Sequence, residues 1–166
     1  MKAIVAVDEN WGIGFDGEML FHIPEDLKRF KALTTGKVVV MGRATFDSLP
    51  GRKPLKNRTN IVLTKNKDLL IDSVIVCHSL EDLLSAISIY DTDDVFIIGG
   101  QHIYTQLYDS CNSILVTKIK EHKEADTFFP NLDLLDYWVV ESQSEESDYN
   151  GIKYTYYRYQ NTRFQP

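Results

Sequence analysis

The clearest indication of the fold is the stretch Val95-Phe96-Ile97-Ile98-Gly99-Gly100-Gln101-His102-Ile103-Tyr104. The apolar run 95–98 predicts a buried strand, and Ile103, Tyr104 and Leu107 follow at helical spacing. Gly99-Gly100 therefore lies where a strand passes directly into a helix, whose first N–H groups can face a phosphate. On its own a Gly-Gly pair is more often a tight turn, so this interpretation needs support from other residues.

Strands and helices alternate on both sides of this stretch. Apolar runs predict further strands at 2–7, 38–41, 59–63, 74–77, 114–119, 137–143 and 153–160. Helices are expected from Pro24, over 44–48 and after the capping residue Ser79, while 8–23 reads as a long loop. We predict a single α/β domain over 1–166, with a mixed, mainly parallel central sheet of about eight strands, an antiparallel C-terminal edge and about four flanking helices.

Length and composition exclude several classes of protein. The 166 residues, 43% of them hydrophobic, suffice for one domain and not for two. No apolar run approaches the ~20 residues of a membrane span, and Asp8 interrupts the first strand before a secretory leader forms. We therefore expect a cytoplasmic protein without a membrane partner. Cys77 and Cys111 are too few for a disulfide framework, and the histidines lack metal-binding spacing, so no metal site is expected.

Charge is unevenly distributed along the chain. The net charge of −6 argues against a nucleic-acid partner. Residues 36–67 nevertheless carry eight Lys or Arg and one acid, so that 8 − 1 gives +7 and the remainder of the chain sums to −13. A compact positive field of this kind concentrates small anions, although a solvated basic face is the simpler explanation.

Two glycine motifs compete as a dinucleotide site. Gly12, Gly14 and Gly17 spell G-x-G-x-x-G, but the next helix starts only at Pro24 and no acid follows the next strand. Both features are needed for the dinucleotide fingerprint, so we interpret these glycines as turns of a mobile loop. Gly99-Gly100 is better placed.

Residues at the ends of other strands support a phosphate-binding role for Gly99-Gly100. Arg43 and Thr45 lie at another junction between a strand and a helix, and Thr64-Lys65 follows the next strand. Two such junctions together with cations predict a site for a phosphorylated dinucleotide.

One acid lies at an apolar position. Asp26 shares the helical stripe of Phe30 and Leu33, and Thr117 lies on the apolar side of a later strand. A buried hydroxyl needs a partner, and an Asp–Thr pair would bind a group with parallel N–H donors. The alternative is a half-exposed first-turn acid that interacts with the helix dipole. No Ser-His-Asp or Cys-His arrangement is apparent.

Several ordered motifs together resemble the dihydrofolate reductase family, from residue 3 to about 159. They are Ile13-Gly14, Ile23-Pro24-Glu25-Asp26-Leu27-Lys28-Arg29-Phe30-Lys31, Val40-Met41-Gly42-Arg43-Ala44-Thr45, Arg58-Thr59-Asn60-Ile61-Val62-Leu63-Thr64, Ile98-Gly99-Gly100-Gln101-His102-Ile103-Tyr104 and Ala125-Asp126-Thr127-Phe128-Phe129-Pro130. The resemblance implies NADPH-dependent reduction of 7,8-dihydrofolate, by hydride transfer to pterin C6 and protonation of N5. It also implies a small-molecule substrate and, we expect, a monomer.

The resemblance also implies the roles of particular residues. Asp26, supported by Thr117, would accept hydrogen bonds from the pterin, and Arg58 would bind the glutamate α-carboxylate. Substrate-binding positions would be Ala6, Asp26, Phe30, Leu55, Arg58 and Thr117. Cofactor-binding positions would be Ala6, Ile13, Gly14, Gly42, Arg43, Ala44, Thr45, Leu63, Thr64, Lys65, Ile98, Gly99, Gly100, Gln101, His102, Ile103 and Tyr104.

One position departs from the family pattern. The resemblance implies that Asp26, Phe21 and Thr117 are the catalytic positions. Leu20-Phe21 stands where the family usually has Pro-Trp, and Phe21 lacks the indole N–H that would hold an ordered water near Asp26. Two alternatives stay open: a riboflavin-pathway reductase of the same fold, which reduces a ribosyl sugar phosphate, and a catalytically silent folate- or nucleotide-binding module.

Overall fold

A computed structural model of the chain describes residues 1–164. The strands of its central sheet are β1 (Lys2–Val7), β4 (Val38–Gly42), β5 (Thr59–Leu63), β6 (Val74–Cys77), β7 (Val95–Gly99), β8 (Ser113–Ile119), β10 (Trp138–Gln143), β11 (Ser147–Tyr149) and β12 (Ile152–Asn161). They are ordered β10-β12-β8-β1-β7-β4-β5-β6, and β11 pairs with β12. The strands from β8 to β6 run parallel to one another, whereas β12 is antiparallel to both of its neighbours, β8 and β10. The predicted fold class is confirmed.

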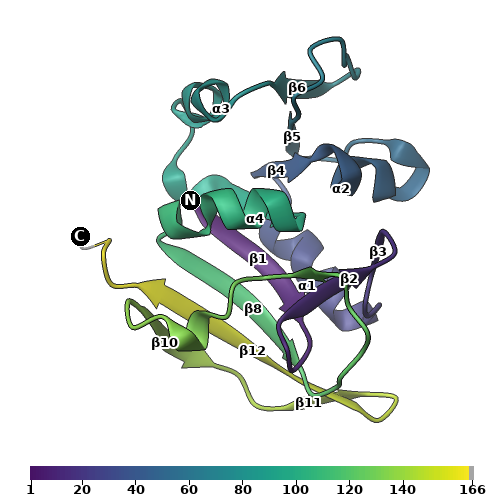
Figure 1. Cartoon of the computed structure of the whole chain (residues 1–166), viewed down its shortest axis with the longest axis vertical. Helices are drawn as coiled ribbons and strands as arrows, with labels where there is room; N and C mark the ends of the chain where they lie inside the picture. The colour runs from purple at the N-terminus through teal and green to yellow at the C-terminus, as the bar shows by residue number, and fades with distance from the viewer. Residues whose placement is uncertain (165–166) are drawn as a thin grey trace.

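Helices cover both faces of this sheet. They are α1 (Pro24–Thr34), α2 (Arg43–Ser48), α3 (Leu80–Ile87) and α4 (Gln101–Leu107). Short 3₁₀ helices span Pro50–Arg52, Thr92–Asp94, Tyr108–Ser110 and Leu132–Leu134. In Figure 1, α4 crosses in front of β1 and α1 lies behind it. Within residues 1–164, no helix combines the length and apolar composition needed to cross a membrane.

Helix α1 is held to the sheet by one apolar face. Phe30 and Leu33 pack against Ile4, Phe96 and Leu115, which alternate with residues that face the opposite side. Burial of one such side chain contributes about 1.5 to 3 kcal/mol, so tertiary packing decides where this short helix forms.

Local capping fixes the start of two helices. Pro at the first position begins α1, as predicted, with Glu25 and Asp26 in its first turn. Ser79 Oγ accepts a hydrogen bond from the Asp82 N–H at 3.0 Å, which confirms the predicted cap of α3.

The prediction of one long loop over 8–23 is wrong. This segment contains β2 (Gly12–Phe15) and β3 (Glu18–Met19), which form a second sheet with β9 (Thr127–Phe128) in the order β3-β2-β9. A Cβ at Gly12 would lie 2.8 Å from Ala125 Cβ, and one at Gly14 would lie 2.7 Å from Thr127 Oγ1. These two glycines therefore permit close packing of strands, and only Gly17, whose φ is +79°, lies in a turn as interpreted; the mobility of the segment stays a prediction.

Candidate functional site

Helix α1 and strand β8 bring the predicted acid and hydroxyl together. The Thr117 hydroxyl donates a hydrogen bond to Asp26 Oδ1 at 2.7 Å, although 91 residues separate them in the chain. Asp26 is half-buried and Thr117 is buried. Ala6 on β1 is the register partner of Thr117, so it lies beside this pair. The Asp–Thr contact predicted from the sequence is present.

The environment of Asp26 disfavours its ionised form. Burial raises the pKa of Asp26 above its ordinary value of 3.8, while the Thr117 hydrogen bond and the charge of Arg29 lower it. A carboxyl group perturbed by burial beside a specific partner is a candidate for a functional role. Asp26 can act here as an acceptor for a cationic or N–H-rich ligand.

Apolar side chains lie on the same side of the sheet as α1. Phe30 belongs to the cluster under α1, Leu55 packs against the cluster of Val39, Met41, Phe46 and Val62, and Ile98 contacts both clusters. Together they offer flat apolar surface close to a polar pair, which is the usual composition of a small-molecule site.

Phe21 lies on the same side of the sheet. It packs with Ala6 against the cluster of Ile23, Ile119 and Tyr154. The Lys123 ammonium lies 4.4 Å from the centroid of the Phe21 ring and donates to the Leu20 carbonyl at 2.8 Å.

Arg58 lies at the opposite end of α1 from Asp26. Its Nη1 donates to Thr34 Oγ1 at 3.1 Å, and its Nε donates to the Lys56 carbonyl at 2.9 Å. Asp26 and Thr34 are eight residues apart on α1, which corresponds to roughly 12 Å along a helix. An extended ligand with N–H donors at one end and a carboxylate at the other would match this spacing.

Strands β1 and β7 separate toward their carboxyl ends. The two strands pair only at Lys2↔Phe96 and Ala3↔Ile97. At the next residue of β1, the Ile4 carbonyl accepts a hydrogen bond from the Tyr104 hydroxyl at 2.6 Å. Peptide groups alternate along a strand, so those of Ala6 point to the same side as those of Ile4. The backbone of Ala6 is thus available to a ligand between the two strands.

The two predicted junctions between strand and helix lie side by side. A Cβ at Gly100 would lie 3.3 Å from Thr45 Oγ1, and one at Gly99 would lie 3.5 Å from the same oxygen. Gly99 also has a φ of +127°, which L side chains rarely adopt. A Cβ at Gly42 would lie 3.1 Å from Ile103 Cγ1. Small residues therefore leave backbone N–H groups accessible at the starts of α2 and α4.

The remaining predicted cofactor positions differ in burial and in their contacts. Ile103 and Tyr104 are buried in the core, so they support the start of α4 and offer no free polar group. Gln101 Oε1 accepts from the Phe128 N–H at 2.7 Å, which ties α4 to the second sheet. Gly14 is buried in β2. The others lie in β2, at the end of β5 or in the first turns of α2 and α4, and are half-buried or exposed: Ile13, Ala44, Leu63, Thr64, Lys65 and His102.

The positive field is weaker than the sequence count suggests. Arg43 Nε lies 3.0 Å from Asp47 Oδ1, and Lys37 Nζ lies 2.5 Å from Asp94 Oδ1. Asp47 is already the one acid in the count of +7, so it is Asp94, outside residues 36–67, that offsets a further part of the predicted charge. Lys65 is exposed beyond the end of β5.

Sequence reasoning missed several residues that shape the site. Asp8 Oδ1 accepts the Gly12 N–H at 2.8 Å and Asp8 Oδ2 accepts the Lys123 N–H at 3.2 Å, so Asp8 joins β2 to a segment far along the chain. His78 Nδ1 lies 3.2 Å from the Thr64 carbonyl. Of the residues missed, only Arg29 had a local signal, because it follows Asp26 at helical spacing.

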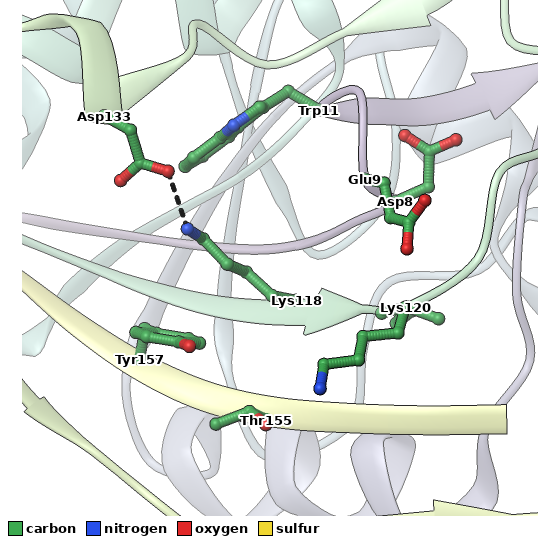
Figure 2. Close-up of a pocket in the computed structure, with 9 residues that line it drawn as sticks. Asp8, Glu9, Trp11, Lys118, Lys120, Asp133, Thr155 and Tyr157 are labelled. Atoms are coloured by element: carbon green, nitrogen blue, oxygen red, sulfur yellow. Dashed lines mark hydrogen bonds and ion pairs between the residues drawn. The ribbon is translucent and has the colours of Figure 1, made fainter. Parts of the chain in front are cut away.

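A separate cavity of about 190 Å³ lies on the face of the sheet opposite α1. Figure 2 shows Lys118 reaching from β8 toward Asp133, with Trp11 and Tyr157 beside it. The Lys118 ammonium is 2.8 Å from Asp133 Oδ2, so this pair is satisfied internally. None of the sequence-predicted site residues lines this cavity. We therefore place the candidate site on the α1 face.

The fold and site define a class: an open α/β protein whose candidate ligand-binding groups gather where parallel strands end and separate. The family model described as dihydrofolate reductase matches residues 1–161. The chain is 36% identical over 157 residues to dihydrofolate reductase of Staphylococcus aureus, covering 94% of each chain. It is 37% identical over 158 residues to that of Bacillus subtilis, covering 95% of this chain and 92% of the relative.

A solved structure is similar over nearly the same length. Dihydrofolate reductase from Enterococcus faecalis, complexed with NADP(H) and RAB-propyl, superimposes with a TM-score of 0.85 at 36% identity, covering 96% of this chain and 95% of that one. The chain belongs to the dihydrofolate reductase family.

Proposed function

We propose that this chain reduces 7,8-dihydrofolate to 5,6,7,8-tetrahydrofolate with NADPH. The observation that carries the proposal is the Asp26–Thr117 pair, set in apolar surroundings at one end of α1, with Arg58 at the other end. A pterin presents parallel N–H donors, which suit a carboxylate, and a glutamate tail presents a carboxylate, which suits a guanidinium. Family membership supports the same reaction.

The residues present fit the cofactor. Glycines at the start of α4 leave room that a Cβ would fill against Thr45, and α4 has no side-chain cap on its first N–H groups. We assign the diphosphate to Gly99 and Gly100, the nicotinamide carboxamide to the backbone of Ala6 and Ile13, and the 2′-phosphate to the region of Thr64 and Lys65. When bound, NADPH supplies the hydride.

In this proposal the protein orients the pterin and raises its affinity for a proton. Asp26 accepts hydrogen bonds from the pterin 2-amino group and N3, and Thr117 fixes the orientation of its carboxylate. Phe30 and Leu55 hold the rings, so that C6 faces the nicotinamide site. Asp26 binds the far edge of the ring system, and a water therefore delivers the proton to N5.

The assay that tests this proposal compares substrates. Consumption of NADPH, followed by its absorbance, is expected with dihydrofolate and not with the ribosyl sugar phosphate of the riboflavin pathway. The sugar phosphate has no pterin for Asp26 and no glutamate for Arg58. Turnover of the sugar phosphate alone would overturn the proposal, and binding of dihydrofolate without turnover would identify a silent module.

Two further features complete the proposal. The protein is proposed to be a monomer, which light scattering of the purified protein tests. A cytoplasmic location stays a prediction that fractionation of the source cells tests.

A further inference from the structure

Arg29 projects from α1 toward strand β12, next to the Asp26 site. It follows Asp26 by three residues and therefore lies on a neighbouring part of the same helix face. Its guanidinium carbon lies 4.0 Å from the centroid of the Tyr156 ring. Tyr156 is the register partner of Thr117, whose hydroxyl binds Asp26. Arg29, Tyr156, Thr117 and Asp26 thus form one contiguous cluster.

The charge of Arg29 is not neutralised by a direct partner. Nη1 is buried without a hydrogen-bond partner among the described residues, and no carboxylate oxygen of residues 1–164 lies within 4.0 Å of its nitrogens. Burial lowers the pKa of Arg29, and Tyr156 and Asp26 raise it. A guanidinium nevertheless stays protonated in proteins, so Arg29 places a permanent positive charge here.

Stacking on Tyr156 keeps this charge close to Asp26 without occupying its oxygens. Oδ1 accepts from Thr117, and within the described part of the chain Oδ2 accepts no hydrogen bond. A direct ion pair would consume the oxygen that a pterin needs. A guanidinium held against a ring acts through space and leaves that oxygen available to the ligand.

Within residues 1–164, no positive charge other than that of Arg29 lowers the pKa of Asp26. On β12, burial raises the pKa of Tyr156 to about 12, so its hydroxyl is neutral, and its neighbour Tyr154 is also a phenol. Thr117 on β8 does not titrate. On α1 itself, Glu25 pairs with Lys28 at 3.3 Å on the exposed side. Arg29 is therefore the group whose charge opposes the effect of burial on the pKa of Asp26.

We propose that Arg29 is a positioning residue of the proposed reaction, which keeps Asp26 ionised in its partly apolar surroundings by a charge held on the ring of Tyr156. This inference rests on the proposed function for its role in turnover. The effect of the Arg29 charge on the ionisation of Asp26 is a property of the protein without ligands and does not depend on the reaction. The simpler explanation, that Arg29 only packs on Tyr156, predicts no effect on the ionisation of Asp26.

The test is a titration of the Asp26 carboxyl carbon by NMR in the enzyme without ligands. Arg29→Met and Arg29→Gln are expected to move its midpoint to higher pH, and Arg29→Lys, which retains a charge, to restore most of the difference. Arg158→Met is the matched control, because Arg158 lines the same surface cavity as Arg29 and Tyr156 but pairs with Glu141 at 2.7 Å. It should leave the midpoint in place.

Kinetics provide the second measurement. The low-pH limb of kcat/KM for dihydrofolate is expected to move to higher pH in Arg29→Met and Arg29→Gln, with about a threefold to tenfold loss on that limb and convergence with the parent at alkaline pH. An unmoved Asp26 midpoint in folded Arg29→Gln would overturn the inference, as would an equal shift in Arg158→Met. A shifted midpoint in an enzyme that does not use dihydrofolate would refute the proposed function and leave the electrostatic role intact.

Discussion

Replacing Asp26 by Asn removes one charge and keeps the shape of the side chain. The amide oxygen still accepts the 2.7 Å hydrogen bond from Thr117, so the fold is expected to survive. A hydrogen bond to a charged acceptor is worth about 1.5 to 3 kcal/mol and one to a neutral acceptor about 0.5 to 1.5 kcal/mol. The NH2 group of Asn replaces the second acceptor oxygen, so two pterin N–H donors would lose at least about 2 to 3 kcal/mol, which is roughly a 30-fold to 150-fold loss in kcat/KM or more.

Initial rates of NADPH consumption across pH measure this loss. Below the pKa of Asp26 the parent also carries a neutral side chain, so the gap between parent and variant is expected to narrow as the pH falls through that pKa. Glu25→Gln is the matched control, because Glu25 is an exposed acid in the same helical turn. A variant within about threefold of the parent at neutral pH would refute the role of Asp26.

The same substitution has a predicted effect on stability. Burial raises the pKa of Asp26 in the folded state above its unfolded value. Its contribution to stability is therefore fully present below the unfolded pKa and is lost as the pH rises through the folded pKa. We expect the Tm of Asp26→Asn at neutral pH to equal or exceed that of the parent, together with the loss of activity. A Tm of Asp26→Asn that is below that of the parent at neutral pH, but equal to it at acidic pH, would contradict the predicted direction of the effect.

Three further substitutions test other parts of the site. Arg58→Ala is expected to raise the KM for dihydrofolate by about tenfold to 100-fold, because a charged hydrogen-bond pair is lost, with the KM for NADPH unchanged; equal rises would remove Arg58 from the substrate site. Lys65→Met should reduce the preference for NADPH over NADH by about tenfold at low salt and by less at high salt. Fluorescence titration measures the two affinities, and an unaltered ratio of the affinities for NADPH and NADH would contradict the 2′-phosphate assignment. Phe21→Trp should raise the rate of single-turnover hydride transfer by no more than about tenfold, because the indole N–H can hold a water. An unchanged rate with weaker dihydrofolate binding would mean that position 21 only packs.

Local sequence patterns determined most of the sheet. Strands such as Thr59–Leu63 and Val74–Cys77 coincide with their predicted bounds, because a run of apolar residues between polar turns is a short-range signal. The Asp–Thr contact was also predictable in kind, since helical and strand periodicities place both polar groups on apolar faces. The sequence alone thus determined the central sheet with its helices and the chemical character of the candidate pocket.

Contacts between segments that are distant in the sequence could not be predicted from local patterns and are seen only in the tertiary structure. Strand β2 forms because β9 lies beside it, and the Asp16 N–H donates to Asp126 Oδ2 across 110 residues, which no local period encodes. The same holds for the separation of β1 from β7 and for the stacking of Arg29 on Tyr156. Periodicity reports which face of an element is apolar, whereas packing of the whole chain decides which faces meet and what each polar group finds there.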